Sequence, residues 1–463
     1  MTLWTARDLA EATGGVLSAP FDAGGVSIDT RTLNPGDLFV ALLGEGRDGH
    51  AFVANALAKG AAGAMVHANV SPAAPTLRVD DTLAGLTRLG GFARARFAGR
   101  LVAVTGSVGK TTTKEMLRAA LSAFGPTHAA AASYNNHWGL PLTLALIPRP
   151  AQFCIAEIGM NHAGEIEPLA RLARPHVAVI TTIAKAHVGH LGSIEAIAAE
   201  KATITRGLEP NGIAVFPADS LHLPLLRAGA SGATVVTFGS DASADVRLLN
   251  AEADADGSRL DISILGRAVR LRLNAPGRHM ALNATATLAT IAALGLDPAK
   301  AIAALEAFAP LSGRGARREL AIAGGTILLL DESYNGNGAS VRAALDVLRL
   351  QPDRRRVAVL GDMLELGDEG PAEHASLADA VEQSADILFT CGPLMRHLHD
   401  SVPSALRGAH AADSNALAPI VAKAITDGDA VLVKGSLGSG MRRIIATLEA
   451  ATSRASTNPA GAA

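Results

Sequence analysis

A short apolar run that opens into a glycine- and threonine-rich turn limits the folds available to this chain. Residues 101–115 read LVAVTGSVGKTTTKE. Glycines let the backbone approach a phosphate closely, and the amides of a strand-to-helix turn supply positive potential. Lys110 adds a charge for the outer phosphates, and the Thr111 hydroxyl is a ligand for Mg²⁺. Val104 replaces the first glycine of the strict pattern, yet the flanking strand and helix favour a phosphate loop over a glycine turn with a solvated lysine.

Strand-like runs alternate with helix-like segments from about residue 100 onward. The runs read LVAVTG, FCIAEIG, VAVITTI, GIAVFPAD and TVVTFG. Because they are apolar throughout and separated by helices, they predict a parallel sheet that is covered on both faces. The first helix follows the phosphate loop and should stop at Gly125-Pro126. Its apolar face consists of Met116, Leu117, Ala120, Leu121 and Phe124.

Three other stretches have their own patterns. Residues 241–275 alternate apolar and polar side chains around an Asp-Gly turn, which predicts antiparallel strands appended to the sheet. From APLSGRGARREL onward the strand and helix alternation returns, with strands in GTILLLDESYN, RRVAVLGDM, ADILFTCG and DAVLVKGS. The first hundred residues carry short strands around VSIDTRTLNPGDLFVAL and a helix at AFVANALAKGA.

The length of 463 residues suits about three domains. We predict an α/β protein: a central parallel-sheet domain of the P-loop ATPase type, flanked by a small N-terminal α/β domain and a Rossmann-like C-terminal α/β domain. The expected domains are 1–97, 98–312 and 313–463, and about the last 12 residues have a disordered composition.

Composition argues against several classes of function. A formal net charge of −2 disfavours a general nucleic-acid binder, and 3% aromatic residues leave few platforms for stacking bases. No run approaches the ~20 apolar residues of a membrane span, and MTLWTARDLAEATGG is not a signal peptide. Cys154 and Cys391 lie far apart in apolar runs, so we expect buried free thiols and a cytoplasmic protein.

Ionisable residues follow several predicted strands, where ligands gather in open α/β sheets. Glu157 ends the strand FCIAE and is a natural Mg²⁺ ligand. His187 follows the next strand, and Lys201 lies on the helix after it. Taken singly, these three would be interpreted as a capping acid, a loop histidine and a solvated lysine. Together with the phosphate loop earlier in the chain, the order of these three residues becomes specific for a nucleotide and metal site.

In the third region, polar residues also follow the ends of the predicted strands. The polar residues at those ends are Asp331, Glu332, Tyr334, Asn335, Asp362, Lys434 and Ser436. Lys434 also fits a structural glycine turn. Arg314, at the junction between the second and third regions, suits a charge clamp on a transferring phosphoryl group.

Further motifs complete a pattern along nearly the whole chain. In order they read SIDTR, PGDLFVAL, GEGRDGHAFV, VTGSVGKTTTKE, NNHWGLPLTL, EIGMNHAGEI, AHVGHLGSIEAIAAEK, PGRHMALNATA, SGRG, DESYNGNGASVRAAL, LGDMLELG and VLVKGS. Each is weak alone, but in this order they resemble the Mur ligases, the ATP-dependent amide-forming enzymes of peptidoglycan assembly.

The resemblance implies that the second domain binds ATP and Mg²⁺. The residues around the phosphates would be Gly106, Ser107, Val108, Gly109, Lys110, Thr111 and Thr112. Asn283 resembles the adenine-reading residue, and Arg314 and Asp331 resemble contacts to phosphate and ribose. The implied metal set is Thr111, Glu157, His187 and Lys201, with Lys201 at the position of the family's carbamylated lysine. The implied catalytic set is Lys110, His187, Lys201 and Arg314.

The resemblance also implies two small-molecule substrates, a UDP-N-acetylmuramoyl-tripeptide and D-alanyl-D-alanine. The candidates for the uridine-nucleotide pocket are Ser27, Thr30, Arg31, Asp48 and His50. Further substrate contacts would be Asn135, Asn136, Lys434 and Ser436. The diaminopimelate-reading motif DNPR of a related ligase is absent, which favours the D-alanyl-D-alanine step. We expect a monomer with no nucleic-acid partner.

The implied chemistry is activation of the tripeptide carboxylate by ATP as an acyl phosphate, which the amine of D-alanyl-D-alanine then attacks. The third domain should close first, because water would destroy the acyl phosphate. Two alternatives stay open. One is another ligase of the same fold, such as a folylpolyglutamate-type enzyme or a tripeptide synthetase. The other is a nucleotide-switched binding protein that hydrolyses ATP without forming a bond.

Overall fold

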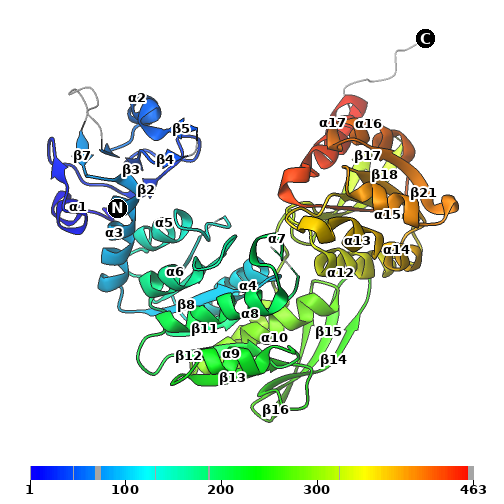
Figure 1. Ribbon diagram of the computed structural model, residues 1–463, viewed down its shortest axis with the longest axis horizontal. Coiled ribbons are helices and arrows are strands. Elements are labelled where there is room, and N and C mark those ends of the chain that lie inside the picture. Colours follow the sequence, from blue (N-terminus) through cyan, green and yellow to red (C-terminus); the bar gives the residue numbers. More distant parts are fainter. Residues whose placement is uncertain are drawn as a thin grey trace.

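The computed structural model describes residues 2–44, 46–67, 75–130, 132–185, 188–322 and 324–456. Figure 1 shows the first and third sheets at opposite ends of the molecule, with the central sheet between and below them. The predicted α/β class is confirmed, whereas the exact domain limits stay a prediction. Among the described helices, none has the length and apolar character that crossing a lipid bilayer requires.

The N-terminal sheet has five strands within the described residues, in the order β1-β7-β6-β3-β2. Their bounds are β1 Val16–Leu17, β2 Gly25–Ser27, β3 Asp37–Val40, β6 Gly63–Val66 and β7 Thr76–Arg78, beside a hairpin of β4 Leu43–Gly44 and β5 Arg47–Asp48. The helices are α1 Ala6–Thr13, α2 Val53–Ala58 and α3 Thr82–Arg96. Helix α1 starts at a capping box of Thr5 and Asp8 and ends at the left-handed Gly14.

The central sheet has the order β16-β15-β14-β13-β12-β11-β8-β10-β9. The strands are β8 Arg100–Thr105, β9 Thr127–Ala129, β10 Phe153–Glu157, β11 Val177–Ile180, β12 Ile213–Pro217, β13 Thr234–Gly239, β14 Val246–Ala253, β15 Ser258–Ile264 and β16 Arg267–Leu273. The helices are α4 Lys110–Ser122, α5 Gly139–Ala145, α6 Ile166–Ala173, α7 Val188–Leu191, α8 Ile194–Ala202, α9 Leu223–Gly229, α10 Arg278–Ala293 and α11 Pro298–Glu306. As predicted, these last strands are antiparallel: β15 pairs antiparallel with both β14 and β16.

Alternation along β8 explains why its residues are apolar throughout. Val102 and Val104 pack in a core cluster with α4 and α10. Leu101 and Ala103 point to the other face and pack with α5, α6 and α8. Because successive strand residues face opposite sides, a strand between two helical layers must be apolar at every position.

The third sheet has the order β17-β18-β22-β19-β20-β21, and β17 is its antiparallel edge. The strands are β17 Ala316–Ile322, β18 Gly325–Glu332, β19 Arg356–Gly361, β20 Ile387–Cys391, β21 Arg407–Ala411 and β22 Ala430–Lys434. The helices are α12 Gly338–Arg349, α13 Gly370–Ala375, α14 Ala378–Ser384, α15 Met395–Ser401, α16 Ser414–Ala424 and α17 Arg442–Ser456.

Among the elements that the sequence pattern missed are the inner strands β6 and β7 of the first sheet and the edge strands β9, β17 and β21. Strands β9, β17 and β21 border their sheets and are partly polar, so they lack the continuous apolar signal of the inner strands. Helix α4 ends at Ser122, before the predicted stop at Gly125-Pro126. Cys154 and Cys391 are free and buried as predicted, and burial raises the pKa of each thiol to about 12.

Arg94 on α3 connects the first domain to the second. Its guanidinium is almost fully buried and donates to the carbonyls of Ala173 at 2.7 Å and Arg174 at 2.6 Å. It also forms an ion pair with Glu209 at 3.0 Å. Removing the guanidinium would leave the two carbonyls without this donor, whereas Glu209 would keep its ion pair with Arg174 at 2.9 Å.

We therefore expect Arg94→Met, which keeps the apolar stem, to lower the free energy of unfolding by about 2–3 kcal/mol, because two carbonyls lose a charged donor and the half-buried Glu209 loses one of its two arginine partners. Urea denaturation followed by Trp4 fluorescence measures the change, since the buried Trp4 indole donates to the Ala145 carbonyl across the same boundary. Arg171→Met is the control, because its ion pair with Glu167 is exposed. Equal stability of the two variants would contradict the anchoring role.

Candidate active site

The phosphate loop lies between β8 and α4, as predicted. Gly106 and Gly109 adopt φ values of +149° and +86°, which side chains with a Cβ rarely adopt. Gly109 is the residue before the first turn of α4, so the free amides of that turn point out of the helix start. This is the backbone geometry of an anion site at a helix N-terminus.

A second segment, residues 181–184, supports the loop from behind. Ser107 N donates to Thr182 O at 2.7 Å, and Ser107 Oγ donates to Ala184 O at 2.9 Å. Thr181 Oγ1 donates to Val108 O at 2.6 Å. These bonds fix the loop against the end of β11, so its amides are oriented before any ligand binds.

Lys110 lies at the start of α4 and faces the loop. Its ammonium donates to Gly106 O at 2.8 Å. Burial lowers the pKa of Lys110; the Glu157 carboxylate opposes this effect and the Arg314 guanidinium adds to it. The Lys110 ammonium is thus removed from water and lies near the Arg314 guanidinium. A bound phosphate would offset both the cost of desolvation and the repulsion from Arg314.

Glu157, Thr111 and Asn135 form a buried set of oxygen and amide groups. Thr111 Oγ1 donates to Glu157 Oε2 at 2.7 Å, and Asn135 Nδ2 donates to Glu157 Oε1 at 2.7 Å. The described residues contain no group of three His, Cys, Asp or Glu side chains that could hold a metal ion. One carboxylate and one hydroxyl still fit Mg²⁺, which takes few protein ligands and completes its shell with water and substrate phosphates.

The sequence predicts two further metal ligands, His187 and Lys201. His187 lies outside the described residues. Lys201 on α8 is buried, with 1% of its surface exposed. Burial, followed by repulsion from Lys110, holds the pKa of Lys201 well below its ordinary value, while Glu200 opposes the shift. The structure therefore brings two lysines together behind the phosphate loop.

Arg314 reaches this site from the third domain. Its Nη2 donates to Ser133 Oγ at 2.9 Å, and Ser133 Oγ lies 3.2 Å from Thr111 Oγ1. The guanidinium also stacks on the Tyr334 ring, 4.0 Å from the centroid. The predicted junction arginine thus contacts the second domain directly.

A cavity of about 420 Å³ joins these groups. It lies between the phosphate loop, the loop that holds Ser133 and Asn135, and the third-domain loop around Tyr334. The other predicted residues on its wall are Asn136, Asn283, Lys434, Ser107, Val108, Gly109 and Thr112. Asn283 lies beside Gly109 of the loop, and its Oδ1 accepts from Thr113 at 3.3 Å. The volume is in the range of small-molecule sites.

Three predicted third-domain residues bond within their own domain. The Lys434 ammonium contacts Glu332 at 3.3 Å and the Asn335 carbonyl at 3.0 Å. Asp331 accepts from Gly313 N and Ser312 Oγ, both at 2.8 Å. Ser436 Oγ accepts from Leu364 N at 2.9 Å. These bonds shape the loops around the cavity, so the predicted ribose contact of Asp331 and the predicted substrate contact of Ser436 stay predictions.

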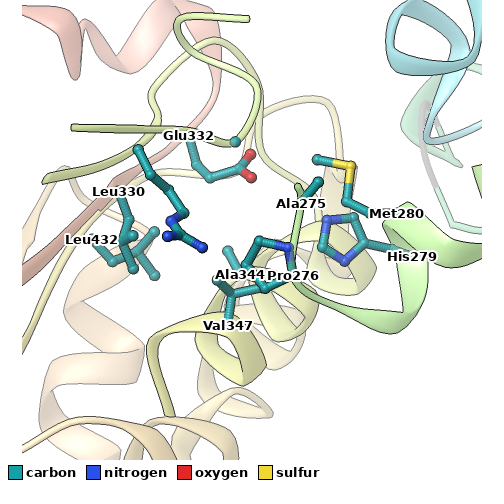
Figure 2. A pocket seen from close by; sticks show the side chains of 11 residues that line it. Ala275, Pro276, His279, Met280, Leu330, Glu332, Ala344, Val347 and Leu432 are labelled. Carbon is teal, nitrogen blue, oxygen red and sulfur yellow. The ribbon is translucent and has the colours of Figure 1, made fainter. Parts of the chain in front are cut away.

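A smaller space adjoins the site at the start of α10. Figure 2 shows His279 and Met280 on one side of it and Leu330 and Leu432 of the third sheet on the other, with Glu332 above. Its volume of about 20 Å³ has room for about one water molecule. Burial lowers the pKa of His279, and Glu332 opposes the shift.

The five predicted uridine-pocket residues lie in the N-terminal domain. Ser27 ends β2 and donates to Asp29 O at 3.0 Å, and Arg31 pairs with Asp29 at 2.6 Å. Thr30 accepts from Lys59 through its carbonyl. Asp48 contacts His50 Nδ1 at 2.6 Å. The described residues lining the 420 Å³ cavity come from the second and third domains, so this set is a separate region.

Sequence reasoning missed Ser133 and the support formed by residues 181–184. Ser133 is a small polar residue in a loop, where neither periodicity nor a motif marks it. The hydrogen bonds of Thr181 and Thr182 to the loop depend on the adjacency of β11 and β8, which the chain alone does not specify.

The fold and the site define the class of phosphate-loop nucleotide-binding enzymes, here with a third domain that contributes Arg314 to the cavity at the phosphate loop. Three family models match the chain: the Mur ligase family catalytic domain at residues 23–86, the Mur ligase middle domain at 104–291 and the Mur ligase glutamate ligase domain at 313–437.

Relatives of known name cover nearly the full length. The UDP-N-acetylmuramoyl-tripeptide–D-alanyl-D-alanine ligase of Escherichia coli is 35% identical, over 96% of this chain and 98% of that protein. The Bacillus subtilis ligase of the same name is 33% identical over the same shares. The crystal structure of MurF from Acinetobacter baumannii has a TM-score of 0.86 at 31% identity, covering 96% of this chain and 99% of that one.

A crystal structure of the MurF ligase from Thermotoga maritima in complex with ADP has a TM-score of 0.78 at 25% identity, covering 93% of this chain and 98% of that one. This chain therefore belongs to the Mur ligase family. The resemblance inferred from the ordered motifs is confirmed.

We expect Gly106→Ala to weaken ATP binding by at least about tenfold, because the new Cβ would collide with Thr181 Oγ1 and the residue would have to keep an unfavourable φ. Isothermal titration calorimetry measures the affinity. Gly91→Ala is the control, since that Cβ meets only Leu172 at an ordinary contact distance inside α3. Unchanged binding by Gly106→Ala would show that the support from Thr181 does not set the loop.

Proposed function

We propose that the protein is an ATP-dependent ligase that joins D-alanyl-D-alanine to UDP-N-acetylmuramoyl-tripeptide in peptidoglycan precursor synthesis. One observation carries the proposal: Lys110 on the phosphate loop and Arg314 from another domain line one cavity that also holds Glu157. The names of the two full-length relatives, which are 35% and 33% identical to this chain, support the choice of substrates.

In the first step, the negatively charged tripeptide carboxylate must approach the negatively charged triphosphate of ATP. The tripeptide carboxylate attacks the γ-phosphorus of ATP, the bond to the β-phosphate oxygen breaks, and ADP and an acyl phosphate result. Lys110 and Arg314 offset the repulsion and stabilise the charge spread over the transferring phosphoryl group. The amine of D-alanyl-D-alanine then attacks the acyl carbon and loses a proton, and phosphate leaves as the amide forms.

We propose that Thr111 and Glu157 hold Mg²⁺, with His187 and a carbamylated Lys201 as further members of the set. Bound Mg²⁺ would neutralise charge on the outer phosphates. The lowered pKa of Lys201 supports carbamylation, because the neutral amine is the form that reacts with CO₂. Carbamylation would also place an anion near the buried Lys110 ammonium.

The remaining predicted residues receive proposed roles by position. Asn283 would contact adenine, because it lies between the phosphate loop and the cavity. Asn135, Asn136 and Lys434 would contact the peptide substrates on the cavity wall. The separate N-terminal set, Ser27 to His50, would bind the uridine nucleotide. Because those two regions lie apart, a long substrate that spans them suits the arrangement.

Phosphate release by the purified full-length protein tests the function. We expect release only when ATP, UDP-N-acetylmuramoyl-tripeptide and D-alanyl-D-alanine are all present, since the acyl phosphate needs both a carboxylate and an amine. Lys110→Ala should abolish release, whereas Lys423→Ala, on the exposed face of α16, should not. Release from ATP alone would indicate a nucleotide switch. Release with glutamate or diaminopimelate in place of the dipeptide would indicate another ligase of this fold.

Lys201→Ala should lose at least about 99% of ligation, because the proposed anionic ligand is absent. Added short carboxylic acids such as acetate or formate should restore part of the activity by supplying a carboxylate in the vacated space. The same phosphate-release assay measures both. Full activity of Lys201→Ala without any added acid would remove this residue from the metal set.

A further inference from the structure

Ser133 lies in the loop between β9 and α5 and faces the same cavity as the phosphate loop. Its hydroxyl has partners from two distant segments. Arg314 Nη2 donates to Ser133 Oγ at 2.9 Å across a separation of 181 residues. Ser133 Oγ also lies 3.2 Å from Thr111 Oγ1 at the start of α4. Ser133 therefore joins the junction arginine to the phosphate-loop helix.

The donors and acceptors fix the direction of these bonds. Thr111 has one hydroxyl proton and donates it to Glu157 Oε2 at 2.7 Å. Toward Ser133 the Thr111 oxygen can then only accept, so the Ser133 proton points at Thr111. The Ser133 oxygen accepts from Arg314. A one-way chain of hydrogen bonds thus runs from the guanidinium through two hydroxyls to a carboxylate, and the charges at its ends strengthen it.

The guanidinium of Arg314 is held from two sides. Tyr334, from the same domain, stacks under its plane at 4.0 Å. Stacking fixes the plane of the guanidinium but leaves the group free to rotate within that plane. Ser133, from the second domain, supplies a directional contact that stacking lacks. Within the described part of the chain, Ser133 accepts the side-chain hydrogen bond that this guanidinium donates.

We propose that Ser133 is a positioning residue that holds Arg314 over the phosphate loop before the nucleotide arrives. This inference rests on the proposed function, in which Arg314 stabilises charge on the transferring phosphoryl group. Ser133 does not itself touch the reacting atoms. It removes the need to find and orient a long, flexible arginine side chain after ATP has bound.

Kinetics of five full-length variants test the proposal, with Arg314→Ala as the reference for the double variant. Ser133→Ala should lower kcat for ligation about tenfold and change the KM for ATP less than about threefold, because orientation rather than ground-state binding is lost. Ser133→Thr keeps the hydroxyl and should restore most of kcat. The double variant Ser133→Ala/Arg314→Ala should be no slower than Arg314→Ala, because Ser133 acts through Arg314. Ser122→Ala is the matched control, since its hydroxyl bonds only within α4 on the exposed face.

A second measurement needs neither nucleotide nor activity. The ¹⁵Nε–H signal of Arg314, assigned by its loss in Arg314→Lys, reports the order of this side chain in the nucleotide-free protein. We expect the order parameter to fall in Ser133→Ala and to stay unchanged in Ser133→Thr and Ser122→Ala.

An unchanged order parameter in Ser133→Ala, or a double variant that is clearly slower than Arg314→Ala, overturns the proposal. If the unmodified protein forms no amide at all, the proposed function fails. The order parameter then still decides whether Ser133 positions Arg314.

Discussion

Two basic side chains from different domains, Lys110 and Arg314, meet at the active site of this protein. Burial lowers the pKa of Lys110 and repulsion from Arg314 adds to the shift, while burial, followed by repulsion from Lys110, lowers the pKa of Lys201. Glu157 is the carboxylate that offsets Lys110. A group of buried like charges is unfavourable until an anion joins it. The free protein therefore carries an electrostatic cost that a nucleotide triphosphate would relieve, and the rest of the fold must hold the cations in place against it.

The central sheet supplies that rigidity through its strand order. Strand β8 lies between β10 and β11, so the carboxyl ends of three neighbouring strands deliver the phosphate loop, Glu157 and Thr181 to one edge. Close packing on both faces of β8 leaves the strands little freedom to move apart. The charged groups are thus attached to the least deformable part of the molecule.

The third domain contributes through its junction with the second. Asp331 holds Gly313 and Ser312 at the start of that domain, which directs Arg314 toward the phosphate loop. Near the site the hydrogen bond from Arg314 to Ser133 links the two domains, and the 420 Å³ cavity and a small space at the start of α10 lie between them. This kind of joint suits a ligase of the Mur family, because an acyl phosphate must be shielded from water and its products must later be released.

The sequence was enough to predict the α/β class, the inner strands of the second and third sheets, the phosphate loop and the charged residues at strand ends. Those features depend on local spacing: apolar runs, glycines in turns, and a lysine and threonine at a helix start. The tertiary structure alone decided the burial of Lys201 beside Lys110, the inward bonds of Asp331, and the link from Ser133 to Arg314 across 181 residues. It also placed the edge strands β9, β17 and β21, whose mixed residues satisfy no single period. Hydrogen bonds between loops and the pairing of edge strands depend on which strands become neighbours in the sheet. No short stretch of the chain encodes that adjacency.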